Sequence, residues 1–368
     1  MTFSFDLATP DDDAAIRRLL ATNPVPGHIT LNYEREPAYF AGCGTMGHFW
    51  QVLVAREEAT GRIVGLACRA TRPLFVNGRV EEVGYLSQLR VDKDYRGRWL
   101  VAKGFHKMHA LHDDGRVRGY LATIIEENRE AQGILVERPR RHFPAFREVT
   151  KLATLAILLR RHGHCTPSPC EIRSGGEVSL GEIVAFLREH GAQRQFFPVY
   201  SNEDFEGSSL TLGFCNEDFA VACRGSSIVG VMGLWDQSAY KQMVVQGYSG
   251  TLRWARPLIN GVARLFGAPS LPAPGRALSF VYASFLCIAG NDPAVFQTLL
   301  ERLYQQAAVR GYSFLMLALS AADPLLPVAQ QYAHIPYHSR LYTVCWEDGE
   351  RFHHELDQRL PAIEIAAL

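Results

Sequence analysis

The sequence predicts an α/β protein built from two tandem copies of one domain. Its 368 residues exceed the usual size of a single hydrophobic core, so two domains are expected. Patterns typical of strands are followed by patterns typical of capped helices in both halves of the chain. The order of these patterns in residues 1–164 recurs in residues 165–368, which indicates a duplicated domain rather than an array of short repeats.

The first residues predict a strand followed by a helix. Residues 3–8 alternate as a strand does, and Thr9 and Pro10 precede a helix whose first turn is acidic. Residues 25–48 have no clean period and predict a loop with one short helix near residues 34–40. Two strands then follow on either side of Gly61, as in a hairpin.

Residues 79–115 predict a strand, a tight basic loop and a helix. The strand alternates between two faces, with Val83, Tyr85, Leu89 and Val91 on one and Glu82, Gln88 and Arg90 on the other. The loop contains Arg96, Gly97 and Arg98, and the helix ends at Gly115. The first N–H groups of a helix are unpaired and partly positive, and a glycine lets an anion come close. This loop therefore predicts an anion site.

The remaining segments complete the first copy and repeat it. After a strand at 119–127 and a short helix at 128–137, the first copy is expected to end in a strand pair near 146–159. In the second copy, Ser179 and Glu182 are spaced as a capping box before a helix that ends at Gly191. Later segments repeat the strand, helix, strand and closing strand at 277–290, 293–310, 312–320 and 337–346.

Two segments lie outside this repeat. A linker is expected at 162–169, and residues 237–276 form an insertion in the second copy. The insertion mixes aromatic residues with Lys241, Arg253 and Arg256. It could line an acceptor pocket or stack on a nucleobase, although packing against the first domain is the simpler expectation.

Composition limits the partners of the chain as a whole. Lys plus Arg and Asp plus Glu both number 38, so long-range attraction to nucleic acid or to an anionic membrane is not expected. The longest apolar run, residues 152–159, is too short to span a bilayer. The first residues lack the pattern of a secretory signal, and eight cysteines without a CxxC pair suit reduced thiols. These features predict a cytoplasmic protein.

No metal site is expected. His106, His109 and His112 recur every third residue, but such steps drift around a helix and place the outer two poorly for one ion. His162, His164, Cys165 and Cys170 have no standard zinc spacing.

These motifs resemble the GCN5-related N-acetyltransferase family. The matching residues are the Leu-Arg-Val segment before the Tyr-Arg-Gly-Arg loop, and Asn128 with Ala131 after the next strand. The resemblance implies two tandem acyl-CoA N-acyltransferase domains, each a mixed β-sheet flanked by helices, with acyl-CoA wedged between the splayed fourth and fifth strands. It implies transfer of an acetyl group from acetyl-CoA, or from another acyl-CoA, to a primary amine of a small molecule or an amino acid derivative. The second half matches by topology only.

The resemblance also implies which residues bind the cofactor. The family's fourth-strand backbone contacts to the pantetheine arm and acyl carbonyl fall on Leu89, Arg90 and Val91. The pyrophosphate loop falls on Arg96, Gly97, Arg98, Trp99 and Leu100, and Asn128 would hold the pantetheine from the far strand. The second copy has no basic loop at this position, so we expect one acyl-CoA site, in residues 1–164. The second domain would complete the acceptor cleft.

The catalytic groups are less certain because the sequence departs from the family at two positions. Trp99 stands where the family usually repeats glycine, and Leu135 stands where it often has a tyrosine that acts as general acid. The amine must lose a proton before it attacks the thioester, and Glu82 with Tyr85 as an accessory is one candidate pair. Glu81 and Glu82, the two glutamates at the start of this strand, could equally be solvated. A transferase of longer acyl chains and a non-catalytic acyl-CoA-binding or protein-binding member remain alternatives.

Overall fold

A single mixed β-sheet runs through both halves of the molecule. The computed structural model describes residues 2–24, 29–137, 143–160, 169–265 and 269–368. Within these residues, twelve strands pair in the order β1-β3-β4-β5-β6-β14-β7-β13-β12-β10-β9-β8. The strands are β1 Phe3–Leu7, β3 Phe49–Glu57, β4 Ile63–Val76, β5 Arg79–Val91, β6 Tyr120–Ile125, β7 Ala145–Leu158, β8 Glu171–Ser174, β9 Phe219–Arg224, β10 Ser227–Trp235, β12 Phe280–Ile288, β13 Phe314–Ser320 and β14 His334–Cys345. The predicted mixed α/β class is confirmed.

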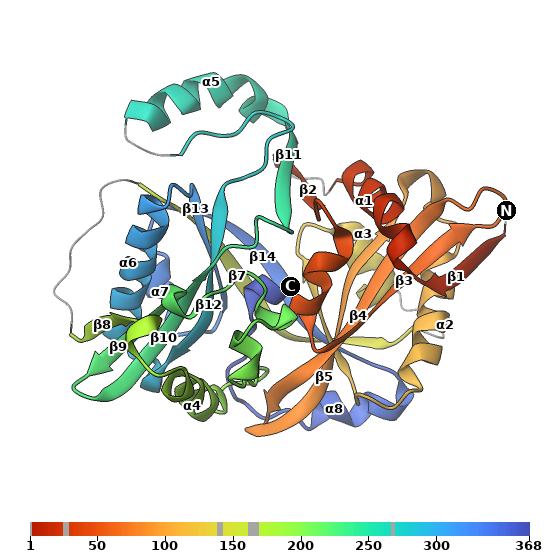
Figure 1. Ribbon diagram of the computed structural model, residues 1–368. Helices are drawn as coiled ribbons and strands as arrows, with labels where there is room; N and C mark the ends of the chain where they lie inside the picture. Colours follow the sequence, from red (N-terminus) through yellow and green to blue (C-terminus); the bar gives the residue numbers. More distant parts are fainter. Residues whose placement is uncertain (1, 25–28, 138–142, 161–168, 266–268) are drawn as a thin grey trace.

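Helices flank this sheet, and one arm projects from it (Figure 1). The helices are α1 Asp13–Thr22, α2 Leu100–His112, α3 Arg129–Gln132, α4 Leu180–Gly191, α5 Gly250–Leu265, α6 Pro293–Val309, α7 Leu326–Ala329 and α8 Glu350–His354. The arm consists of α5 and a two-stranded ribbon, in which β2 Ile29–Glu34 pairs with β11 Gln242–Tyr248. The expected insertion therefore packs on the first half through this ribbon.

The two halves exchange their last strands. β7 of the first half pairs with β13, and β14 of the second half pairs with β6. β7 and β14 also pair with each other along the middle of the sheet. The predicted strand pair near 146–159 is wrong, because this segment is one strand whose neighbours both come from the second half. The domain division at 164 stays a prediction, and most of the expected linker lies outside the described residues.

Some local predictions are confirmed and three are wrong. Thr9 and Asp12 form a capping box ahead of α1. Ser179 is the N-cap of α4 but makes no side-chain cap bond, and the capping box of this region joins Ser174 and Glu177 instead. Residues 29–34 form a strand rather than a loop because they pair with β11, a partner more than 200 residues away that local patterns do not reveal. The helix predicted near residues 34–40 is also wrong in position, since a 3₁₀ helix spans Tyr39–Met46 instead.

Candidate functional site

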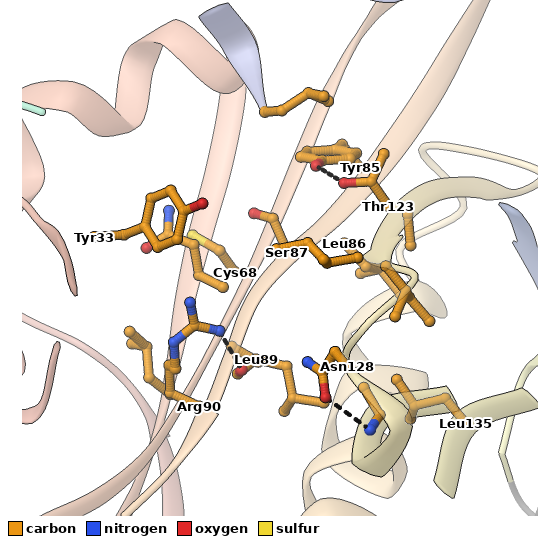
Figure 2. A pocket seen from close by; sticks show the side chains of 18 of the residues that line it. Tyr33, Cys68, Tyr85, Leu86, Ser87, Leu89, Arg90, Thr123, Asn128 and Leu135 are labelled. Atoms are coloured by element: carbon orange, nitrogen blue, oxygen red, sulfur yellow. Dashed lines mark hydrogen bonds between the residues drawn. The ribbon is translucent and has the colours of Figure 1, made fainter. Parts of the chain in front are cut away.

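β5 and β6 run parallel and separate almost as soon as they meet. Only Gly84 with Tyr120 and Tyr85 with Leu121 are paired in the described strands. A Cβ atom at Gly84 would lie 2.0 Å from Cδ1 of Tyr120, so the last contact before the separation requires glycine. Beyond Tyr85 no described strand pairs with this edge of β5, and a cavity of about 340 Å³ opens there (Figure 2).

A β-bulge at Gln88 shapes the floor of this cavity. Ser87 faces Cys68 on β4, but Arg90 faces Leu66, so β5 has one extra residue between these pairs. Gln88 has φ of 56°, and its Oε1 accepts a hydrogen bond of 2.9 Å from the Tyr39 hydroxyl. A bulge of this kind re-aims the residues that follow it.

The bulge corrects the predicted faces of the strand. Val83 and Tyr85 belong to one hydrophobic cluster, whereas Leu86 and Leu89 pack against another. The prediction that Val83, Tyr85 and Leu89 share a face is therefore wrong, because the extra residue at Gln88 inverts the alternation.

The walls of the cavity differ in chemistry. One wall is apolar and belongs to a single hydrophobic cluster around α2, made of Phe5, Leu53, Ala67, Leu86, Leu89, Val101, Phe105, Met108, Ala122, Ile124, Leu135 and Phe146. The other wall combines residues of both halves with the insertion: Tyr33, Arg35, Cys68, Ser87, Arg90, Lys241, Met243, Tyr282, Tyr337, Ile365 and Leu368. Among the described lining residues, three are cationic (Arg35, Arg90 and Lys241) and Glu34 alone is acidic.

The second half has an equivalent separation of strands that the chain itself fills. β12 pairs in parallel with β13 only from Phe280 to Tyr282, and Phe285 has φ of 56° at a register shift toward β10. The backbone N–H of Phe285 donates a hydrogen bond of 2.8 Å to Glu364. The space left beside residues 361–365 is about 40 Å³.

Solved structures share this architecture, although no protein-family model and no curated protein sequence matches the chain. Saccharomyces cerevisiae N-myristoyltransferase with bound myristoyl-CoA is 12% identical, with a TM-score of 0.60 over 93% of this chain and 82% of that chain. A GCN5-related N-acetyltransferase from Sphaerobacter thermophilus is 13% identical, with a TM-score of 0.55 over 99% of this chain and 98% of that chain. A GCN5-related glucosamine N-acetyltransferase region in a fungal multi-domain β-N-acetylglucosaminidase is 13% identical, with a TM-score of 0.61 over 93% of this chain and 38% of that chain.

The chain has the GCN5-related N-acetyltransferase fold. Its sheet contains two pairs of parallel strands that separate, as the resemblance to the family implied. The space between β5 and β6 is open, and the space between β12 and β13 is filled by the chain itself. Identities of 12–13% show the fold alone, so the chemistry has to come from the residues of the open site.

Five of the residues predicted to bind the cofactor line the open cavity of this fold: Leu89, Arg90, Val91, Leu100 and Asn128. Asn128 is also the N-cap of α3, because its Oδ1 accepts a hydrogen bond of 3.1 Å from the N–H of Ala131. In Figure 2 the amide nitrogen of Asn128 points toward Leu89 on β5, across the gap between the strands. The residues predicted to bind the cofactor therefore lie on both sides of the gap, with Leu89 to Val91 on β5 and Asn128 opposite them.

The predicted phosphate loop lies at the start of α2. Its last residue, Leu100, lines the cavity, whereas residues 96–99 do not. Gly97 and Trp99 have φ of 77° and 61°, and Trp99 is the N-cap of α2 with 64% of its side chain exposed. The indole therefore points away from the first turn of the helix instead of blocking it. Arg96 lies 3.1 Å from Glu130 in an exposed ion pair, and the Arg98 guanidinium lies 5.0 Å from the Tyr95 ring centroid. An exposed pair of this kind is weak, so a phosphate could displace Glu130.

The structure separates the two predicted catalytic residues. Tyr85 lines the cavity and its hydroxyl lies 3.0 Å from Thr123 Oγ1, while burial raises the pKa of Tyr85 to about 12. Glu82 is exposed, does not line the cavity, and accepts a hydrogen bond of 2.6 Å from Thr71. Its role in proton transfer stays a prediction. Leu135, at the position of the family's tyrosine, is buried in the apolar wall.

The sequence analysis named Lys241 only as one cation of an insertion that could line an acceptor pocket, and the structure makes it a functional candidate. Its Nζ donates hydrogen bonds of 2.7 Å to the Leu368 main-chain oxygen and 3.2 Å to that of Ala366. Burial, with the nearby Arg35 guanidinium, lowers the pKa of Lys241 to about 7. A lysine in an insertion gives no such signal, because its burial depends on residues more than 100 positions away.

The described residues show no group of three or more His, Cys, Asp or Glu side chains that could hold a metal ion. His112 is buried, with its ring nitrogens 3.0 Å from the Tyr120 hydroxyl and 3.0 Å from Asp348. His109 and His112 both stack on Trp346. The histidines at 162 and 164 lie outside the described residues, as does Cys165.

Proposed function

We propose that this protein is an acyl-CoA-dependent N-acyltransferase with one active site, at the separation of β5 and β6. The observation that supports this most directly is the contrast between the two copies of the fold. The first copy has an open cavity of about 340 Å³ beside its bulge, whereas Glu364 fills the corresponding position of the second. The thioester would lie where the backbone of β5 has no strand partner.

The donor would be held from both sides of the gap. The unpaired edge of β5 at Leu89 to Val91 offers backbone groups to the amides of the pantetheine arm. Asn128 offers its amide nitrogen from the opposite side. The first N–H groups of α2, with Arg96 and Arg98, would bind the pyrophosphate.

We propose that the acyl chain is longer than acetyl. The cavity volume lies in the range of sites that enclose a whole small ligand, and its α2 wall is apolar throughout. Each methylene buried there would contribute about 0.8 kcal/mol. The similar N-myristoyltransferase structure contains myristoyl-CoA, which fits this proposal. Acetyl transfer, the first expectation from the sequence, needs only a small part of this wall.

The acceptor would be an amine that also has a carboxylate, such as an amino acid derivative. Arg35 is 7% exposed and forms no ion pair with a described residue, and Arg90 likewise has none. A buried cation without a counter-ion is costly, so a ligand carboxylate beside Arg35 would stabilise it. The aromatic rings of Tyr33 and Tyr337 complete this wall.

Proton transfer would use two groups that line the cavity, Lys241 and Tyr85. Near pH 7 much of Lys241 is neutral, so its amine can accept the proton that the acceptor ammonium must lose. Tyr85 stays protonated and can donate a hydrogen bond to the developing charge near the thioester.

A thiol-release assay tests the proposal. Acyl-CoA donors of increasing chain length are mixed with a panel of amino acids and simple amines, and free CoA is measured. Release that depends on both substrates supports N-acyl transfer, and a preference for amino acids over matched amines without a carboxylate supports the acceptor class. If no donor releases CoA with any acceptor and no donor binds by calorimetry, the proposed function is wrong.

A further inference from the structure

Helix α5 exposes one apolar face to solvent. Trp254, Leu258 and Leu265 are 80%, 73% and 84% exposed. Spacings of four and seven residues place these three side chains on the same face of a helix. Large apolar side chains gathered on one exposed face usually mark an interaction site.

The opposite face of α5 is held by the chain that returns from the arm. Asn260 exchanges two hydrogen bonds with the backbone of Leu271, of 3.0 and 2.7 Å. Arg256 Nε donates to the same carbonyl oxygen at 3.2 Å. The Tyr248 hydroxyl, just before α5, donates to Pro272 at 2.7 Å. These bonds fix which face of the helix is outward, so the exposed face belongs to the folded arm.

The charge of the inserted segment that contains α5 has one sign. Between Asp236 and Asp292 the sequence contains no acidic residue. Arg253 is exposed beside the apolar face, with its guanidinium 5.7 Å from the Trp254 ring centroid. The zero net charge of the whole chain, from which no membrane partner was expected, conceals this local excess of positive charge.

We propose that α5 binds the surface of an anionic phospholipid membrane and lies in the plane of the interface. The apolar face would enter the boundary between headgroups and acyl chains, Trp254 would occupy its preferred interfacial position, and Arg253 would contact lipid phosphates. No described helix meets the length and hydropathy needed to cross a bilayer, so the mode is surface binding.

The positive charge favours this occupant over a second copy of the chain. Two basic helices brought face to face would repel each other, whereas an anionic lipid surface complements the arm. The ribbon that joins α5 to the body also contributes Tyr33 and Met243 to the cavity wall. The inference does not depend on which acyl group is transferred.

Vesicle flotation tests the inference. The purified protein is mixed with vesicles of equal parts phosphatidylglycerol and phosphatidylcholine, and with pure phosphatidylcholine vesicles, at about 0.1 M salt. Wild type should float with the anionic vesicles and bind the neutral ones more weakly. The double variant Trp254→Ser/Leu258→Ser should lose binding by about tenfold. Val309→Ser is the matched control, because Val309 is 88% exposed at the end of α6, and it should bind as wild type does.

The outcomes separate the possible occupants. A blue shift of tryptophan emission on adding anionic vesicles, absent in the double variant, would support insertion of Trp254. Absence of flotation, or equal binding by wild type and double variant, would overturn the inference. So would a wild-type dimer in sedimentation equilibrium that the double variant converts to monomer without vesicles, because the face would then be a contact between copies. Normal thermal unfolding of the double variant excludes misfolding as the cause of lost binding.

Discussion

Glu364 accepts a hydrogen bond of 2.8 Å from the backbone N–H of Phe285, at the bulge of β12 that corresponds to the bulge at Gln88 in β5. The same carboxylate accepts a bond of 3.1 Å from Ala366. In the second copy the backbone donor at the bulge is therefore satisfied within the chain. The segment that does this continues to Ile365 and Leu368, which line the open cavity of the first copy. The same C-terminal segment therefore fills the space in the second copy and lines the cavity in the first.

This arrangement predicts a specific pH dependence of stability. Burial raises the pKa of Glu364 above its ordinary value of 4.5, although its hydrogen bonds oppose the shift. The folded state therefore holds a proton that the unfolded state releases, so the stability contributed by Glu364 is complete below pH 4.5 and is lost as pH rises through the folded pKa. Urea unfolding across this range should show that slope in wild type and not in Glu364→Gln. Parallel curves for the two proteins would contradict the assignment.

The loop before α2 should control CoA affinity. Arg96→Ala should weaken CoA binding about tenfold, since charge-assisted contacts contribute about 1.5–3 kcal/mol, and the loss should shrink in high salt. Replacing Gly97 as well should abolish binding, because its φ of 77° disfavours other residues. Arg173→Ala is the control, since Arg173 pairs with Glu171 on the remote edge strand β8. Unchanged affinity in the double variant, measured by calorimetry, would place the phosphates elsewhere.

Gly104 should set the length of acyl chain that the cavity accepts. It lines the cavity from α2, and the nearest atom to an added Cβ is 3.8 Å away on Phe5, so a larger side chain can enter the free space. With wild type, kcat/KM should rise about fourfold for each methylene until the cavity is full. Gly104→Leu should move the optimum to shorter chains and retain acetyl transfer. Ala110→Leu adds a similar volume on the exposed side of α2 and should leave the profile unchanged; an identical shift in both variants would mean a general effect on the helix.

Lys241 should govern the acidic limb of the pH profile. With a pKa of about 7, the amine becomes available as a proton acceptor as pH rises through neutrality, so kcat/KM should rise there. Lys241→Met should lower kcat about 100-fold and remove that limb. The free energy of unfolding of the Lys241→Met variant should not fall, because the substitution removes a buried cation. If the limb persists in Lys241→Met, the proton is taken by another group.

Substitutions of Tyr85 and Glu82 should have different effects on kcat. Tyr85→Phe removes a hydroxyl in the cavity and should lower kcat about tenfold, with acyl-CoA affinity retained. Glu82→Gln changes an exposed side chain bonded to Thr71 and should leave kcat near the wild-type value. Steady-state kinetics of both variants decide between the two residues. A large loss of kcat in Glu82→Gln alone would restore the role predicted for it from the sequence.

The sequence predicts the parts of the site that are local in the chain. The strand, the basic loop and helix α2 are contiguous, and their patterns of apolar residues, glycine and caps are visible within about 40 residues. Leu89, Val91, Leu100 and Asn128 were named through the resemblance to the family, whose motifs lie in this contiguous stretch, and all four line the cavity.

The remaining features depend on contacts between remote residues. The exchange of β7 and β14 could not be predicted, because the sequence patterns assign each closing strand to its own half. The bulge at Gln88 depends on its contact with Tyr39, and the position of Lys241 depends on residues 366–368. Tertiary context overrides local pattern at each of these places. The faces predicted for the strand at 79–91 were wrong for this reason.

A crystal structure with CoA tests the central claim most directly. The pantetheine arm should lie between β5 and β6 beside the bulge at Gln88, with the pyrophosphate at residues 96–100 and the thiol facing the cavity that Tyr85 and Lys241 line. CoA bound between β12 and β13, or outside the separation of β5 and β6, would contradict the account.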